Sequence, residues 1–251
     1  MKRSQSYFVQ DLNINDNDNN NNIDSAKKTI SDPSNTKRLQ QEFFTQYSTI
    51  ELAKNLLGKL LCRQFDNGVQ IKGMIVETEA YIGPEDHASY TFGGRRTVAN
   101  EPMYMAAGTC FIRLIYGMYY CFNLSSQDYG GAVLIRAVEP MVESIDKMIE
   151  LRLLHPKASG NSQQFKSKPY LLANGPSKLC IAFNIDQFMN RKNIITDHSI
   201  WLEHNDDDND PLEIKPENIV ESTRIGISSK NPWSNRLLRF YLRQNRSVSK
   251  F

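Results

Sequence analysis

The segment between Leu60 and Val138 is rich in β-branched and aromatic residues and is punctuated by turn signals, and this pattern restricts the fold most strongly. Strand-like stretches are predicted at residues 60–65, 69–81, 110–124 and 132–138. Asn67-Gly68 is typical of a two-residue hairpin turn, and Tyr116-Gly117 interrupts the third stretch as a second hairpin tip. Helix-like segments flank this block and do not alternate with its strands, which predicts a single α+β domain.

Helices are predicted where capping signals coincide with apolar residues at helical spacing. The predicted helices span residues 48–58, 139–155 and 176–183. The first begins with the capping box Ser48-x-x-Glu51. The other two place a proline, Pro140 or Pro176, in the first turn, where its missing N–H costs nothing.

An asparagine-rich run marks the boundary of the folded part. Residues 13–22 read NINDNDNNNN, with seven Asn in ten positions. Such a segment cannot bury enough apolar area to offset backbone ordering, which costs roughly 1–2 kcal/mol per residue. We therefore expect residues 1–36 to be a disordered tail and residues 37–251 to form the domain.

The charges nearly balance, with 30 Lys+Arg against 28 Asp+Glu, so only their local distribution is informative. Residues 206–210 read DDDND, whereas residues 222–251 hold seven basic residues and no acidic one. Such a basic stripe can hold phosphates, although a solvated basic terminus is the commoner explanation.

The uncharged stretch 114–127 is shorter than the roughly 18 apolar residues that a membrane span needs, and polar residues follow Lys2 and Arg3 where a secretory signal would be apolar. An intracellular protein is expected. The cysteines are widely spaced and are expected to be buried, reduced thiols: Cys62, Cys110, Cys121 and Cys180. The histidines lack the i, i+4 spacing of helical metal sites, so no metal is expected.

Two carboxylates, Glu77 and Glu79, lie two residues apart in a predicted strand and are expected to share a face with the apolar Ile71 and Ile75. If that face is the core, at least one carboxylate lies at a cleft or is paired, because an isolated buried charge is very costly. An ion pair with an arginine is the commoner explanation, and a catalytic carboxylate is the alternative.

Two tyrosines stand where a flat ligand could stack. Tyr81 follows the carboxylates, and Gly83-Pro84 then ends the strand. A carboxylate and an aromatic at the mouth of a sheet fit a pocket in which a ring stacks while the carboxylate transfers a proton. Tyr116, at the second hairpin tip, is either a wedge between bases or a side chain that folds back into the core.

Several long motifs occur in the order found in one known family. They are residues 75–89 (IVETEAYIGPEDHAS), 93–95 (GGR), 114–127 (LIYGMYYCFNLSSQ), 133–140 (VLIRAVEP) and 175–180 (GPSKLC). Together they resemble the alkyladenine (3-methyladenine) DNA glycosylase family. The resemblance implies a curved antiparallel sheet with flanking helices and a protruding β-hairpin. It also implies a monofunctional glycosylase that flips damaged purines out of duplex DNA and hydrolyses the N-glycosidic bond without metal or cofactor.

The resemblance implies a role for each matching residue. Glu79 matches the general base that deprotonates the attacking water, and Arg136 would orient that water or fix the backbone phosphate. Tyr116 would fill the gap left by the flipped nucleotide. Tyr81 would be one stacking wall, and Asn123 would exclude guanine by crowding its 2-amino group. DNA-backbone contacts are implied for Arg95, Tyr119 and Lys178.

Two residues of the base pocket depart from the family's pattern: Tyr90 replaces a histidine and Arg113 replaces an aromatic residue. Both belong to the wall opposite Tyr81. If Arg113 faces the pocket, it stacks on neutral rings and repels cationic bases such as 3-methyladenine. We then expect selectivity to move toward neutral lesions such as hypoxanthine or ethenoadenine.

Two alternatives to an active glycosylase remain. One is a catalytically weakened protein of the same fold that binds damaged DNA, although a pure binder needs no carboxylate at position 79. The other is an RNA-directed module, since the family's fold resembles a domain of methionyl-tRNA formyltransferase. The expected partner is double-stranded DNA with a damaged purine. The protein is expected to act as a monomer and not to associate with membranes. The protein is expected in the nucleus, and mitochondria are a second expected location.

Overall fold

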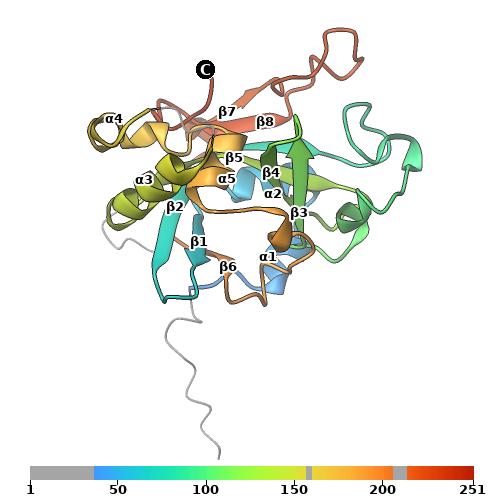
Figure 1. Cartoon of the computed structure of the whole chain (residues 1–251). Coiled ribbons are helices and arrows are strands. Elements are labelled where there is room, and N and C mark those ends of the chain that lie inside the picture. The colour runs from blue at the N-terminus through green and yellow to red at the C-terminus, as the bar shows by residue number, and fades with distance from the viewer. Residues whose placement is uncertain (1–36, 157–159, 206–213) are drawn as a thin grey trace, which may run out of the picture. The chain divides into compact units, whose positions relative to one another are not determined.

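An antiparallel sheet of eight strands curls into a half-barrel and forms the framework of the fold (Figure 1). The strands are β1 (Leu60–Gln64), β2 (Gln70–Tyr81), β3 (Cys110–Ile115), β4 (Tyr119–Ser125), β5 (Ala132–Pro140), β6 (Ile200–Glu203), β7 (Ile219–Ser222) and β8 (Arg239–Leu242). The main path has the order β3-β4-β5-β2-β1-β6, and β8 pairs with both β2 and β7. The predicted α+β fold with a curved antiparallel sheet, flanking helices and a protruding hairpin is confirmed.

This computed structural model describes residues 37–156, 160–205 and 214–251. The expected Asn-rich tail (1–36) and the Asp-rich run (206–210) lie outside the described residues. Within the described ranges, no helix is long and apolar enough to cross a bilayer.

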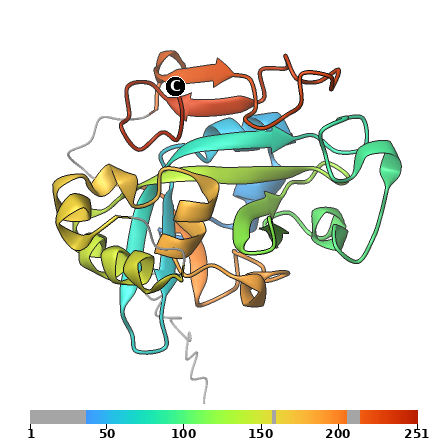
Figure 2. The ribbon, with the colours of Figure 1, turned by 45° about the horizontal axis from the view of Figure 1, so that its top comes forward.

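The central strand β2 changes its partner along its length. Its first half pairs with β1, from Gln70 opposite Gln64 to Met74 opposite Leu60. Its second half pairs with β8 through residues 77–79, while β5 lies along its other edge. Figure 2 shows β7 and β8, in red, beside this second half. The end of β2 is therefore hydrogen-bonded on both sides.

Short helices flank the sheet. The α-helices are α1 (Gln41–Thr45), α2 (Thr49–Asn55), α3 (Ile145–Leu154), α4 (Ser162–Ser167) and α5 (Pro176–Ala182). The 3₁₀ helices are η2 (Phe92–Gly94), η3 (Glu101–Tyr104), η4 (Val142–Ser144), η5 (Pro169–Leu171), η6 (Gln187–Met189) and η7 (Pro216–Asn218). The predicted capping box is present at the start of α2, where Ser48 and Glu51 exchange side-chain and backbone hydrogen bonds.

The prediction that a helix begins at Glu139-Pro140 is wrong. Strand β5 continues through Pro140, which pairs with Gly73 of β2, and α3 begins only at Ile145. Proline is tolerated there because β4 pairs with β5 only through residues 132–135, so Pro140 lies on an edge of the sheet. The sheet thus outweighs the local helix signal.

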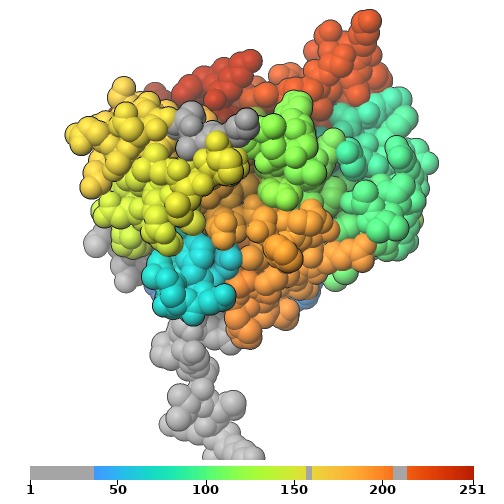
Figure 3. Space-filling model, viewed as in Figure 1, coloured from blue at the N-terminus to red at the C-terminus, as the bar shows by residue number. Residues whose placement is uncertain are grey.

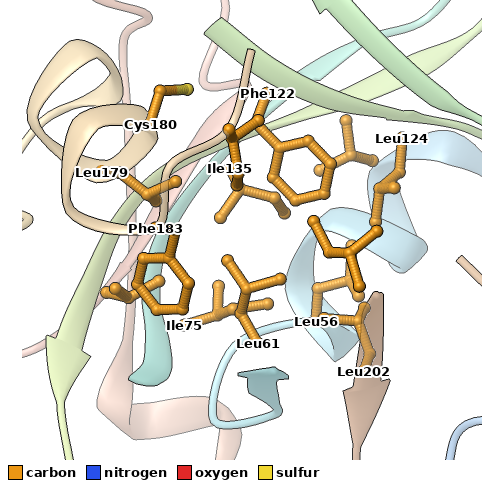
Figure 4. Close-up of a cluster of buried hydrophobic side chains, with 14 of the residues drawn as sticks. Leu56, Leu61, Ile75, Phe122, Leu124, Ile135, Leu179, Cys180, Phe183 and Leu202 are labelled. Carbon is orange, nitrogen blue, oxygen red and sulfur yellow. The ribbon is translucent and has the colours of Figure 1, made fainter. Parts of the chain in front are cut away.

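The main core lies between the sheet and helices α2 and α5 (Figure 4). Phe122 of β4 and Ile135 of β5 meet Leu56, which follows α2, and Phe183, which follows α5. All four are 0% exposed. Burying each such side chain contributes roughly 1.5–3 kcal/mol, and this packing fixes the strands that carry the candidate site.

Candidate active site

A β-bulge separates the two carboxylates from the apolar face of β2. The pairing of β2 with β5 shifts register between Ile75 and Glu77 and again between Glu77 and Thr78. Ile75 packs in the main core, and the Thr78 hydroxyl donates a hydrogen bond to the carbonyl of Ala53 in α2. The prediction that Glu77 and Glu79 share the face of Ile75 is therefore wrong, because a bulge interrupts strand alternation.

Glu79 is 0% exposed and accepts hydrogen bonds at both carboxylate oxygens. The amide N–H of Ile225 donates to its Oε1 at 2.7 Å, and Nη1 of Arg136 lies 3.2 Å from the same atom. The Tyr81 hydroxyl donates to Oε2 at 2.9 Å. The carboxylate is thus fixed in position by three groups from different parts of the chain.

The surroundings of Glu79 have opposing effects on its pKa. Burial raises the pKa of the carboxyl above its ordinary value, while Arg136, the Ile225 amide and the Tyr81 hydroxyl lower it. Burial and the neighbouring Glu79 raise the pKa of Tyr81 well above its ordinary value, so this hydroxyl stays protonated and donates. A carboxylate with a raised pKa is suited to accepting a proton near neutral pH.

Glu77 has a structural role. Its carboxylate lies 3.0 Å from Nε of Arg136 and 2.9 Å from Nη1 of Arg239, and it accepts two hydrogen bonds from Ser249. The interpretation of a buried glutamate as a partner of arginine is therefore confirmed for Glu77, and Glu79 also has an arginine partner in Arg136. Arg136 lies between the two carboxylates, so Glu77 also fixes the guanidinium that contacts Glu79.

A cavity of about 490 Å³ lies beside these groups, within the size range of small-molecule sites. Its lining includes six of the predicted site residues: Tyr81, Tyr90, Arg113, Tyr116, Asn123 and Arg136. Ile225 lines it as well, so all three partners of Glu79 lie in the cavity wall. Figure 3 shows the surrounding surface, with the β3–β4 hairpin in green beside the turquoise segment that follows β2.

Tyr81 is held from behind by a buried ion pair that the sequence did not reveal. The guanidinium of Arg224 lies 4.6 Å from the centre of the Tyr81 ring. Both nitrogens of its fork donate to the carboxylate of Asp86, and the two side chains are 1% and 0% exposed. This pair joins the loop after β2 to the loop after β7 across the back of Tyr81.

The same ion pairs change the interpretation of the basic C-terminal stripe. Arg224 and Arg239 belong to it, yet both are buried and paired with Asp86 and Glu77. These two residues form ion pairs inside the fold and therefore do not contribute to a phosphate-binding surface.

Asn123 is buried in β4 and lines the cavity. Its Nδ2 donates to the carbonyl of Phe111 in β3 at 3.0 Å. This hydrogen bond fixes the orientation of the side-chain amide in the cavity wall.

The two residues that depart from the family's pattern contact each other. The guanidinium of Arg113 stacks over the ring of Tyr90, 3.7 Å from its centre. Both residues line the cavity, and Tyr90 is 42% exposed. The condition set for Arg113, that it faces the pocket, is met.

Tyr116 stands at the hairpin tip between β3 and β4 and is 87% exposed. It has a φ of 51° and the following Gly117 a φ of 69°, which is the pattern of a type I′ turn. Leu114 and Met118 beside it are 50% and 45% exposed. The ring therefore points away from the core, and the alternative that it folds back is wrong.

The residues expected at the DNA backbone are scattered. Arg95 is exposed, Tyr119 stacks with His155 at 5.9 Å between ring centres, and Lys178 donates to Asn174 at 2.8 Å. None of the three lines the cavity. Their contact with DNA stays a prediction.

The thiols fit the expected reduced cysteines except in one detail. Cys62, Cys110 and Cys180 are buried, whereas Cys121 is half-buried and lines the cavity. In the described part of the chain, no group of three or more His, Cys, Asp or Glu residues is arranged to hold a metal ion.

A fixed carboxylate behind a cavity large enough for a nucleobase, with an exposed aromatic ring on a neighbouring hairpin, fits an enzyme that acts on an extruded base. Residues 42–246 match the methylpurine-DNA glycosylase family, and the chain belongs to this family. It is therefore a monofunctional glycosylase, a hydrolase of DNA repair.

Individual relatives agree with this assignment. The chain is 41% identical to the human DNA-3-methyladenine glycosylase over 212 residues, which are 84% of this chain and 68% of that protein. It is 42% identical to the mouse DNA-3-methyladenine glycosylase over 214 residues, which are 84% of this chain and 61% of that protein. A relative from Clostridium tetani is 43% identical over 215 residues, which are 85% of this chain and 99% of that protein.

Proposed function

We propose that the chain extrudes an alkylated or deaminated purine from duplex DNA into the cavity, where Glu79 activates the water that hydrolyses its N-glycosidic bond. The observation that carries this proposal is the position of Glu79 directly behind the cavity wall, in contact with Tyr81, Arg136 and Ile225. A carboxylate so placed is close to the sugar of a base that occupies the cavity.

The proposed step is a hydrolysis. The water oxygen forms a bond to C1′ while the C1′–N bond breaks and its electron pair leaves with the base. The water proton passes to Glu79, and the sugar keeps the hydroxyl as an abasic site. The charge of Arg136 favours the ionised form of the carboxylate before the step and so opposes the effect of burial on its pKa.

Extrusion of the base is supported by the hairpin tip. An exposed aromatic ring costs nothing to the fold when it inserts into the stack, and unstacking costs a few kcal/mol that an inserted ring offsets in part. Tyr116 has the required exposure and lines the cavity mouth together with Leu114. Exclusion of guanine by Asn123 is supported by the fixed orientation of its amide.

The alternative of a catalytically weakened binder is less well supported. The ion pair of Glu79 with Arg136 and its hydrogen bonds to Tyr81 and Ile225 hold the carboxylate against the cavity wall, which binding alone does not require. Action as a monomer and residence in the nucleus stay predictions.

The test uses duplex DNA that carries a single hypoxanthine or is freshly methylated to contain 3-methyladenine. We expect release of the free base and an abasic strand that breaks only after alkali treatment. An undamaged duplex of the same sequence should release nothing, and excess tRNA should compete poorly. Binding without release of any damaged base would support the binder and contradict the proposal.

A further inference from the structure

Arg113 brings a positive charge to the wall of the cavity. Arg136 is paired with Glu77 and Glu79. Arg224 is paired with Asp86. Among the residues that the structure describes, no carboxylate pairs with Arg113; its guanidinium stacks on Tyr90.

The ring of Tyr90 fixes where this charge lies. The guanidinium lies over the ring of Tyr90, 3.7 Å from its centre, and this contact holds the charge beside the cavity. Because both residues line the cavity, a base in the cavity meets a positive charge on this side. The charge is therefore part of the site.

The chemistry of departure differs between two classes of damaged purine. A purine that carries a positive charge from N-alkylation leaves as a neutral molecule, since the electron pair of the C1′–N bond cancels its charge. A neutral purine such as hypoxanthine leaves as an anion and takes up a proton from water afterwards. Only the second class develops negative charge on the base in the transition state, and a fixed cation beside the base stabilises that charge.

We propose that Arg113, oriented by Tyr90, is a specificity-determining residue that makes neutral damaged purines the preferred substrates of this chain. It stabilises the negative charge on the departing base and disfavours a cationic base in the cavity. The inference rests on the proposed function and names the substrate class of that same site.

The experiment compares single-turnover release of hypoxanthine and of 3-methyladenine by the wild type and by Arg113→Gln. Neither base carries a 2-amino group, so the proposed exclusion by Asn123 does not affect the comparison. The wild type should release hypoxanthine faster. Arg113→Gln should lower the hypoxanthine rate roughly tenfold or more and raise the 3-methyladenine rate. Arg113 is exposed, so its replacement should leave the fold intact, which the melting temperature checks.

Matched variants distinguish the effect of the charge in the cavity from the effect of the overall charge of the protein. Arg243→Gln removes an exposed arginine that does not line the cavity, and it should leave the ratio of the two rates unchanged. Arg113→Lys keeps the charge and should retain most of the preference. Tyr90→Phe keeps the ring that holds Arg113 and should preserve the ratio of the two rates. Tyr90→Leu removes the ring and should move this ratio toward the ratio measured for Arg113→Gln.

The outcomes distinguish the two proposals. If the wild type releases neither base, the proposed function fails, and this inference fails with it. If it releases both and Arg113→Gln leaves the ratio unchanged, the proposed function stands and the role of Arg113 is contradicted.

Discussion

Nη1 of Arg136 lies 3.2 Å from Oε1 of Glu79, and both side chains are almost completely excluded from solvent. Without this partner, the buried carboxylate would be protonated over a wider range of pH, because burial disfavours its charged form. Arg136 is itself held by Glu77, which is held by Arg239 and Ser249. The Glu79 carboxylate is therefore the end of a connected network of buried charges.

Replacement of Arg136 should move the pH dependence of excision. A general base works only when deprotonated, so the proposed role of Glu79 predicts that activity falls as the pH decreases through the pKa of this residue. Arg136→Gln removes the charge that lowers this pKa, and the midpoint of the acidic limb should rise by roughly 1–3 pH units. Arg136→Lys should give a smaller rise. A limb that stays in place or moves to lower pH in single-turnover profiles would contradict this role.

Breaking the ion pair behind Tyr81 should destabilise the fold. Asp86→Asn leaves the guanidinium of Arg224 buried without its countercharge, which should lower the free energy of unfolding by about 3–5 kcal/mol. The control is Glu221→Gln, which removes the exposed pair with Lys54 and should cost at most about 1 kcal/mol. Urea denaturation measures the free energy of unfolding of both variants. An equal decrease in the two would contradict a larger contribution of the buried pair to stability.

The hairpin tip should matter for DNA and not for stability. Tyr116→Ala removes an exposed side chain, so the free energy of unfolding should change by less than about 0.5 kcal/mol. Excision from duplex DNA should fall, and excision from single-stranded DNA should fall less, because no stack has to be held open there. Phe188→Ala is the matched control, since Phe188 is also 87% exposed but does not line the cavity. Equal effects of Tyr116→Ala on both substrates would argue against a wedge.

Local signals in the sequence were sufficient for much of the framework. The capping box of α2, the strands from Leu60 to Val138 and the Tyr116-Gly117 turn depend on neighbouring residues, so short-range patterns predict them. The helix start at Pro140 was wrong because pairing with Gly73 of β2, far away in the sequence, extends β5 to that residue.

The site was predictable where the resemblance covered it and not where distant residues meet. Asp86 and Arg224 lie 138 positions apart, and Glu77 and Ser249 lie 172 positions apart, so no spacing rule joins them. The bulge between Ile75 and Thr78 also leaves no clear sequence signal, yet it decides which face the carboxylates occupy. The contact of Arg113 with Tyr90 depends on the packing of the hairpin beside the loop after β2, which no local pattern predicts.

The most direct test of the account is single-turnover excision by Glu79→Gln, measured together with its binding to the same hypoxanthine duplex. The amide cannot accept the water proton as a base, whereas the shape of the side chain is kept. Binding should stay within a few-fold of the wild type, and the excision rate should fall by about 10²- to 10⁴-fold. A variant that binds normally and still excises at close to the wild-type rate would contradict the assignment of Glu79 as the general base.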